Sequence, residues 1–167
     1  MSPARRTPER PHGLLLEIDH VAIAVADMEA AVAWYAEVLG AAVAHREVVE
    51  SDGVEEVLLP VAESFVQLVA PTSPDSTVAR FLERHGEGLH HVGYRVASCE
   101  AALAAAVAAG AVPIDQVPRP GSRGTTVAFL HPKSALGTLI ELVEVGEEEA
   151  SRASGATPPE GAPESRA

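Results

Sequence analysis

An internal repeat with a constant offset of 71 positions constrains the fold of this chain more than any other feature. His20 and His91 begin the two copies, and each histidine opens a run of branched apolar residues. Identical residues keep the same offset further along, at Val21/Val92, Val25/Val96 and Glu29/Glu100. Self-similarity at a fixed period indicates that one supersecondary unit is present twice.

Each copy contains the same predicted order of elements, which is strand, helix, strand, strand and strand. The first copy is expected to place its strands at 15–25, 41–49, 54–59 and 65–69, with a helix between Asp27 and Leu39. The second copy is expected to place its strands at 90–97, 112–117, 126–130 and 138–145, with a helix from Ser98 to Ala109. The sequence therefore predicts an α+β fold of two tandem βαβββ modules.

The two modules are expected to fill residues 14–145 of the 167-residue chain. Module one covers about 14–71, module two covers 89–145, and a connector helix lies within 72–88. Residues 1–13 are rich in proline and arginine, which indicates a flexible N-terminal arm. Residues 146–167 are mostly Glu, Ala, Ser, Pro and Gly, and such a composition predicts a disordered acidic tail.

The composition argues against several classes of function. The net charge is −12 at pH 7, which opposes binding to the polyanionic backbone of nucleic acids. No apolar run reaches the roughly 20 residues that span a bilayer, so no membrane partner is expected. The chain has one cysteine, Cys99, and its N-terminus lacks the apolar core of a signal peptide. These features predict a cytoplasmic protein without internal disulfides.

Polar residues stand at matching places in the two modules. His20 and His91 open the first strand of each module, while Gln67 and Glu141 lie within the apolar last strands. An amide and a carboxylate in such strands are costly unless they are paired or bind a metal ion. If the modules pack about a pseudo-twofold axis, the four side chains converge. Their donor set suits a divalent ion such as Co²⁺, Mn²⁺, Ni²⁺, Zn²⁺ or Fe²⁺.

Each of these residues also has a simpler interpretation. A single histidine in a strand is usually structural, and only the repeat makes a metal site the better interpretation. His90 is expected to point to the other face of its strand because side chains alternate, so it is not counted as a ligand. Glu55 and Glu56 are expected on opposite faces of their strand, where one would point inward. The inward glutamate is either a solvated residue near a turn or a general base.

Six segments spread over both modules carry a resemblance to a known family. They are Ile18–Ala22, Gln67–Pro71, Ser76–Ala79, Gly88–Val92, His131–Ser134 and Leu139–Leu142. With these segments the chain resembles the vicinal oxygen chelate (glyoxalase/bleomycin-resistance) superfamily, and within it the methylmalonyl-CoA epimerase family. The resemblance implies that the paired modules form a curved mixed sheet around a metal-binding cleft.

The resemblance also implies roles for single residues. In the family, the residues that match His20, Gln67, His91 and Glu141 bind the metal ion, for which Co²⁺ is expected first. The residue that matches Glu56 is one catalytic base, and Glu141 is proposed as the other. The implied reaction interconverts (2R)- and (2S)-methylmalonyl-CoA by removing and returning the C2 proton through an enolate, and belongs to propionate metabolism.

An acyl-CoA substrate also needs contacts for its phosphates. Lys133 and Ser134 are candidate substrate-binding residues, and Arg119 or Arg123 could serve in the same way. An exposed lysine is normally only solvated, which is the simpler interpretation of Lys133. Dimers that pair through sheet edges are common in the superfamily, and a homodimer is therefore expected.

Three other functions use the same fold. A glyoxalase I-type lyase also abstracts a proton beside a carbonyl, but its metal set favours two glutamates, which Gln67 opposes. A ring-cleaving dioxygenase binds Fe²⁺ through two histidines and one carboxylate, and a fourth ligand would crowd that site. A ligand-sequestering binding protein of the bleomycin-resistance type needs neither a metal nor a base, and aromatic residues for stacking make up only 4% of the chain.

Overall fold

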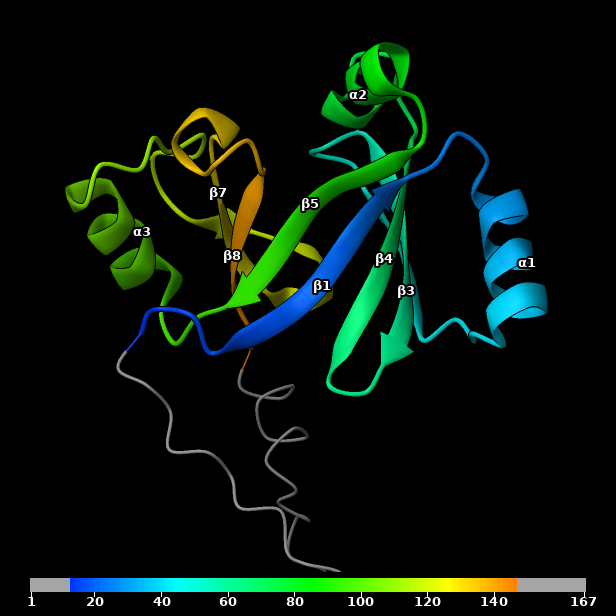
Figure 1. Ribbon diagram of the computed structural model, residues 1–167, viewed down its shortest axis with the longest axis horizontal. Coiled ribbons are helices and arrows are strands. Elements are labelled where there is room, and N and C mark those ends of the chain that lie inside the picture. Colours follow the sequence, from blue (N-terminus) through cyan, green and yellow to red (C-terminus); the bar gives the residue numbers. More distant parts are fainter. Residues whose placement is uncertain (1–12, 147–167) are drawn as a thin grey trace, which may run out of the picture.

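The computed structural model of the protein describes residues 13–146 (Figure 1). The expected arm at 1–13 and acidic tail at 146–167 lie outside the described residues except for Gly13 and Gly146. The chain order is β1 (Glu17–Ala24), α1 (Met28–Leu39), β2 (His45–Val49), β3 (Val54–Val61), β4 (Ser64–Pro71), α2 (Thr77–His85), β5 (Gly88–Arg95), α3 (Cys99–Ala108), β6 (Arg119–Pro120), η1 (Ser122–Gly124), β7 (Thr126–Leu130), η2 (Pro132–Ser134) and β8 (Ile140–Glu144). None of the described helices is long and apolar enough to cross a membrane.

The eight strands within residues 13–146 form one mixed sheet in the order β2-β3-β4-β1-β5-β8-β7-β6. The antiparallel pair β1–β5 lies at the centre, where the two modules join (Figure 1). On either side of it, β1 pairs in parallel with β4, and β5 pairs in parallel with β8. This order confirms the predicted α+β fold of two βαβββ modules with a curved mixed sheet.

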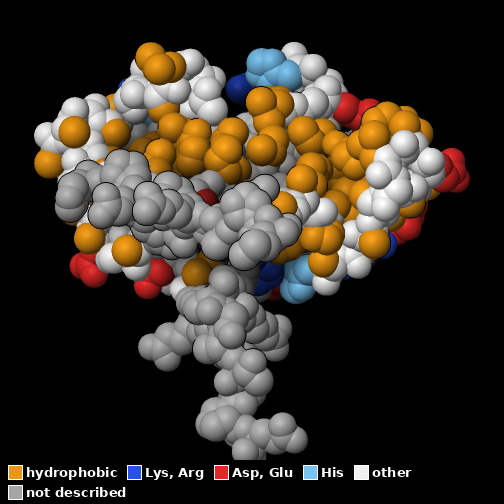
Figure 2. Space-filling model, turned by 60° about the horizontal axis from the view of Figure 1, so that its bottom comes forward, with side chains coloured by type: hydrophobic (Ala, Val, Ile, Leu, Met, Phe, Trp, Pro, Cys, Tyr) orange, Lys and Arg blue, Asp and Glu red, His pale blue; other side chains and the backbone are white. Residues whose placement is uncertain are grey.

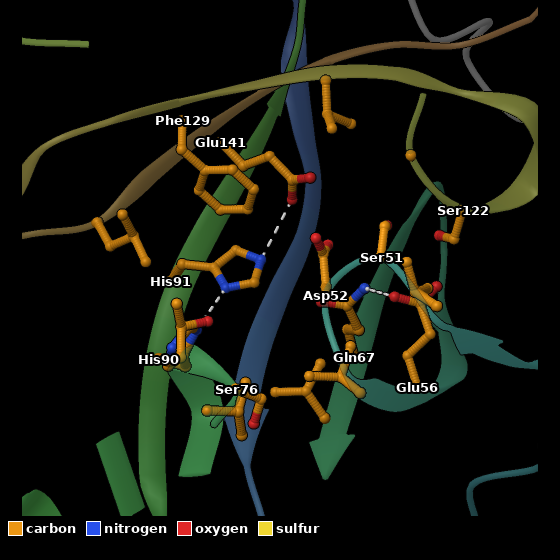
Figure 3. A pocket seen from close by; sticks show the side chains of 18 of the residues that line it. Ser51, Asp52, Glu56, Gln67, Ser76, His90, His91, Ser122, Phe129 and Glu141 are labelled. Atoms are coloured by element: carbon orange, nitrogen blue, oxygen red, sulfur yellow. Dashed lines mark hydrogen bonds and ion pairs between the residues drawn. The ribbon is translucent and has the colours of Figure 1, made fainter. Parts of the chain in front are cut away.

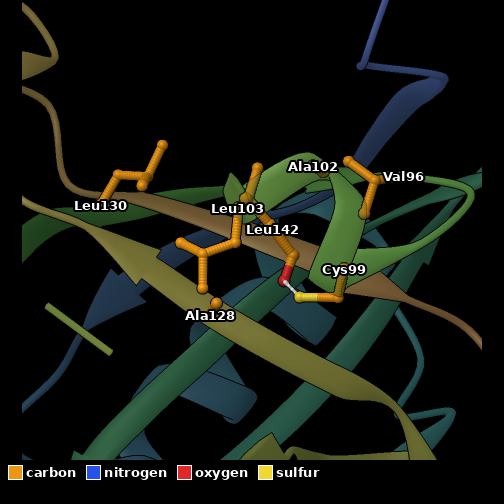
Figure 4. Packing of buried hydrophobic residues seen from close by; sticks show 7 residues of the cluster. All are labelled: Val96, Cys99, Ala102, Leu103, Ala128, Leu130 and Leu142. Carbon is orange, nitrogen blue, oxygen red and sulfur yellow. Dashed lines mark hydrogen bonds between the residues drawn. The ribbon is translucent and has the colours of Figure 1, made fainter. Parts of the chain in front are cut away.

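Helices α1 and α3 lie on the outer sides of the two modules (Figure 1). Asp27 begins α1 by accepting a hydrogen bond from the backbone N–H of Ala30 at 3.0 Å, and Ser98 begins α3 in the same way. Helix α1 buries Met28 against the outward side chains of β3 and β4, and α3 buries Leu103 against β7 and β8. Figure 4 shows this second cluster, in which the Cys99 thiol donates to the carbonyl of Leu142.

The third element of module two differs from the prediction. No strand forms at 112–117, where only Pro113 makes an isolated bridge to Leu130. The short strand β6 lies instead at Arg119–Pro120, in a segment expected to be a loop. Prolines at 113, 118 and 120 provide no N–H for a sheet ladder, so this edge of the sheet cannot form a full strand.

Two β-bulges interrupt the central β1–β5 pair. The register passes from Ile18–Tyr94 to His20–Gly93, which leaves Asp19 as an extra residue in β1. It passes again from Ala22–His91 to Ile23–Leu89, which leaves His90 as an extra residue in β5. Bulges bend a strand and change the direction of side chains. The two extra residues are separated by the same 71 positions as the repeat.

Candidate metal centre and active site

His20, His91 and Glu141 meet on the inner face of the sheet. The Nε2 atoms of the two histidines are 3.0 Å apart, and Oε2 of Glu141 lies 2.9 Å from His20 Nε2 and 3.2 Å from His91 Nε2. All three residues are buried. Ligands about 2.1 Å from a tetrahedral ion lie about 3.4 Å from one another. The three atoms therefore have a spacing that could hold a divalent ion.

The close approach of the modules depends on Gly93. It lies opposite His20 in the β1–β5 register, and a Cβ atom at this position would lie 2.3 Å from Cε1 of the His20 ring. The repeat places Ala22 in the equivalent position, opposite His91. Small residues at both positions leave room for the two imidazole rings.

Gln67 and Glu56 form a second part of the site, on β4 and β3. Nε2 of Gln67 donates a hydrogen bond to Oε2 of Glu56 at 2.9 Å (Figure 3). The remaining side-chain oxygens of both residues, Oε1 in each case, are buried without a hydrogen-bond partner among the described residues. Buried oxygens of this kind normally have a partner. The free amide oxygen of Gln67 therefore fits the role of a further metal ligand.

The inward glutamate of β3 is Glu56. Its side chain is 5% exposed, whereas Glu55 pairs with Arg46 away from the site. Burial and the nearby charge of Glu141 raise the pKa of Glu56 above its ordinary value, and the neighbouring Ser122 only partly offsets this rise. A carboxylate with a raised pKa in a closed site is a suitable general base.

The bulge residues Asp19 and His90 contact the two histidines from behind. Oδ1 of Asp19 lies 2.7 Å from Nδ1 of His20, and Nδ1 of His90 lies 2.8 Å from Nδ1 of His91. Asp19 is completely buried and also accepts hydrogen bonds from Arg95 Nε at 2.7 Å and Arg123 Nη2 at 2.8 Å. Each contact is made to Nδ1 of the histidine, whose Nε2 atom faces the candidate ion site.

The carboxylates of this group are held in their charged form. Burial alone would raise the pKa of Asp19, but hydrogen bonds with His20 and the charges of Arg123 and Arg95 lower it to about 2. Burial likewise opposes ionisation of Glu141, but the two histidines hold its pKa well below the ordinary range. Burial lowers the pKa of His90 to about 4, so this ring is neutral at pH 7. Glu141 therefore presents a charged carboxylate where a cation would bind.

A cavity of about 380 Å³ opens over these residues. Both modules line it, and its walls contain Glu56 and Gln67 on one side and His91 and Glu141 on the other (Figure 3). Further polar side chains line the cavity, among them Asp52, Ser76, Arg119 and Ser122. The cavity is large enough for a small ligand, and the buried carboxyl groups of Glu56 and Glu141 both line it.

Comparison with known proteins shows the family to which the chain belongs. The family model described as Glyoxalase/Bleomycin resistance protein/Dioxygenase superfamily matches residues 19–129. The chain belongs to this superfamily. A superfamily member from Cereibacter sphaeroides, named ethylmalonyl-CoA/methylmalonyl-CoA epimerase, is 38% identical over 77% of this chain and 97% of its own length. The human mitochondrial methylmalonyl-CoA epimerase is 34% identical over 75% of this chain and 72% of its own length.

Solved structures of superfamily members have the same fold. A methylmalonyl-CoA epimerase from Mycobacterium tuberculosis has a TM-score of 0.81 and 34% identity, covering 86% of this chain and 97% of that one. A variant of the Streptomyces coelicolor methylmalonyl-CoA epimerase, in complex with 2-nitronate-propionyl-CoA, has a TM-score of 0.76 and 38% identity over 79% of this chain and 99% of that one. These relatives confirm the predicted membership in the epimerase family and the predicted enzyme class, an isomerase.

The other candidate residues lie in different places. Arg119 and Arg123 line the cavity, but Lys133 and Ser134 lie in η2, outside the residues that line it. The Ser134 hydroxyl accepts from the backbone N–H of Val112 at 2.9 Å. A contact of Lys133 or Ser134 with substrate stays a prediction.

Two residues of the site were missed by the sequence reasoning. The expectation that His90 points away from the site is wrong, because the bulge in β5 breaks the alternation of side chains and turns His90 into the cavity. Asp19 was not singled out at all, although it directly precedes His20 as His90 precedes His91. The shared offset of 71 was the available signal.

Proposed function

We propose that the chain is a methylmalonyl-CoA epimerase, which interconverts (2R)- and (2S)-methylmalonyl-CoA. The observation that carries this proposal is the pair of carboxylates, Glu56 and Glu141, that line one cavity from different modules. A racemising reaction needs a group on each face of the reacting carbon. The named epimerases among the relatives support the choice of substrate.

The proposed reaction begins with removal of the C2 proton. This proton is acidic because C2 lies between a thioester and a carboxylate. Glu56 takes the proton as its carboxylate, and the electron pair of the C–H bond becomes part of an enolate whose charge lies on the thioester oxygen. Glu141, the second proposed catalytic carboxyl, gives a proton to the opposite face of C2, which forms the other epimer and leaves Glu141 ionised. Positioned acid–base catalysis of this kind supplies about 10²–10⁴-fold in rate.

Four residues are proposed to hold a divalent metal ion: His20, Gln67, His91 and Glu141. Co²⁺ is the first candidate, with Mn²⁺, Ni²⁺, Zn²⁺ and Fe²⁺ as alternatives. A bound ion supplies Lewis-acid stabilisation of developing negative charge. Glu141 serves first as a ligand, because its contacts with both histidines keep it ionised, and Glu56 is the principal base.

The contact between Gln67 and Glu56 gives the proposed base a fixed position. The Gln67 amide holds one oxygen of Glu56, and the other oxygen has no partner among the described residues. This second oxygen is the one available to a substrate proton. Arg119, which lines the cavity, is the proposed contact for a CoA phosphate, although it also pairs with Asp52 and Asp115.

The deciding experiment is proton NMR of methylmalonyl-CoA in D₂O with Co²⁺-loaded protein. We expect loss of the C2 proton signal, formation of the other epimer in a coupled mutase assay, and neither change after EDTA treatment. Ethylmalonyl-CoA is assayed in parallel, because one relative is named for both substrates. A folded, metal-loaded sample that exchanges no proton would refute the proposal. Hemithioacetals of 2-oxoaldehydes would then test the glyoxalase I-type alternative, and ligand binding without turnover would favour a sequestering protein.

Glu56→Gln and Glu55→Gln form a matched pair for this assay. The first change removes the proposed base but keeps an amide that can contact Gln67, whereas Glu55 lies on the same strand and pairs with Arg46. We expect Glu56→Gln to lower the epimerisation rate by about 10²–10⁴-fold with unchanged metal content. Glu55→Gln should retain the rate. Near-normal turnover by Glu56→Gln would contradict the assignment of the base.

The protein is further proposed to act as a cytoplasmic homodimer. Figure 2 shows hydrophobic side chains gathered over one face of the described residues. Large apolar side chains are unusually exposed, including Trp34 at 51%, Val38 at 58% and Leu39 at 61%. Contiguous apolar patches commonly mark interaction sites. Light scattering coupled to size-exclusion chromatography is the test, and a monomer at micromolar concentration would contradict the dimer.

A further inference from the structure

The two proposed histidine ligands are oriented by different residues in equivalent positions. Asp19 and His90 are the extra residues of the two β-bulges, and each contacts Nδ1 of the histidine that follows it. We propose that His90 is a positioning residue that fixes the tautomer and ring orientation of His91, as Asp19 does for His20. This inference rests on the metal site of the proposed function.

The hydrogen positions follow from the contacts. Two ring nitrogens 2.8 Å apart need one donor and one acceptor. His91 Nε2 faces His20 and Glu141, and it must carry no hydrogen if it is to bind a cation. The neutral His91 ring then carries its hydrogen on Nδ1 and donates it to Nδ1 of His90. His90 carries its own hydrogen on Nε2, so the two rings have complementary tautomers.

The connector helix holds His90 in this position. The ring of Phe81, on α2, meets the His90 ring edge-on with centroids 4.9 Å apart. The His90 and His91 rings are themselves 5.1 Å apart at an interplanar angle of 75°. His90 is thus fixed between α2 and the candidate ligand, and the orientation of His91 depends on the connector as well as on β5.

A histidine at this bulge has an electrostatic consequence. Asp19, Glu141 and Glu56 already place three carboxyl groups around the site, and two arginines, Arg95 and Arg123, pair with Asp19. A neutral imidazole orients His91 without adding a further negative charge. A second carboxylate at the bulge would instead add repulsion toward a substrate that is itself an anion.

Three variants of the full-length protein test the inference. His90→Leu removes the acceptor, His90→Asn keeps an acceptor oxygen, and His85→Leu is a control because His85 also contacts Phe81, at 4.9 Å between ring centroids. We expect His90→Leu to weaken Co²⁺ binding by about 10–100-fold. His90→Asn should stay within a few-fold of the wild type, and His85→Leu should not differ from it. Calorimetric titration measures the affinities.

A second measurement reads the tautomer directly. In the Zn²⁺-loaded protein, ¹⁵N NMR should show the hydrogen of His91 on Nδ1, and this signal should be lost or exchange rapidly with solvent in His90→Leu. Wild-type affinity in His90→Leu, or an affinity in His90→Asn as low as in His90→Leu, would overturn the inference. If His90→Leu does not fold, the Co²⁺ affinity of His90→Asn relative to that of the wild type decides the question. Neither measurement needs substrate, so a protein that binds metal but lacks epimerase activity would refute the proposed function and leave this inference standing.

Discussion

Replacement of Gly93 by alanine tests the geometry of the candidate site most directly. The added Cβ atom would lie 2.3 Å from Cε1, 2.6 Å from Nδ1 and 2.7 Å from Nε2 of His20. Ordinary contacts between carbon atoms begin at about 3.5 Å, so the ring would have to move by about 1.2 Å. The carboxylates of Asp19 and Glu141 lie 2.7 Å and 2.9 Å from the ring nitrogens of His20, and His20 is only 3% exposed. The movement must therefore break one of these contacts.

Two effects are expected from Gly93→Ala. Overpacking of this kind lowers the free energy of unfolding by about 1–3 kcal/mol. A displacement of about 1 Å in a catalytic group costs about 10²-fold in rate, and metal affinity should fall with it. Urea denaturation, Co²⁺ titration and the epimerisation assay measure the three quantities.

Gly13→Ala is the control for this change, because a Cβ atom at Gly13 meets nothing within 4 Å. It should leave stability, metal affinity and rate unchanged. The contrast with Ala22, which already carries a Cβ atom opposite His91, shows that the restriction is specific to one of the two equivalent positions. A Gly93→Ala protein with wild-type stability and Co²⁺ affinity would refute the reasoning.

Three more predictions follow from contacts behind the site and in the core. Asp19→Asn should lower metal affinity by about 10–100-fold, since it removes the charged partner of His20, and unchanged affinity by calorimetry would contradict that role. Burial raises the pKa of Cys99 to about 11, so only about 0.1% of this thiol is ionised at pH 8. A disulfide reagent should therefore modify Cys99 at least about 100-fold more slowly in the native than in the unfolded protein, and absorbance measures this rate. Leu142→Ala should lower the free energy of unfolding, measured by urea denaturation, by about 2–5 kcal/mol, because it leaves a cavity in the cluster under α3. Leu136 is fully exposed, so Leu136→Ala should change this free energy by less than about 0.5 kcal/mol.

The module architecture could be predicted because the repeat and the helix caps are local signals. Asp27 and Ser98 begin α1 and α3 as expected, and Gly40 ends α1 in the left-handed conformation, with φ of 66°. The prediction of a strand at 112–117 was wrong. The apolar residues of this segment favour a strand, but the prolines in and after it lack the N–H groups that a strand needs. Apolar pattern and hydrogen-bonding capacity were in conflict there, and the hydrogen bonds decided the outcome.

The candidate site could be predicted only in part from the sequence. His20, Gln67, His91, Glu141 and Glu56 were identified because the repeat brings them to equivalent or inward positions, and the structure places them around one cavity. Their roles stay predictions. The orientation of Asp19 and His90 could not be inferred from strand alternation, since a bulge arises from the pairing of two strands and leaves no mark in either strand alone.

The candidate ligands are divided equally between the two halves of the chain. His20 and Gln67 come from the first module, His91 and Glu141 from the second, and the β1–β5 pair is the seam between them. Any ion held by all four residues therefore cross-links the two modules, and its binding free energy adds to the stability of the β1–β5 pair. At a free ion concentration 100 times the Kd this addition is about 2.7 kcal/mol. Amide hydrogen exchange along β1 and β5 should therefore slow when the ion binds, which makes the seam a reporter of metal occupancy.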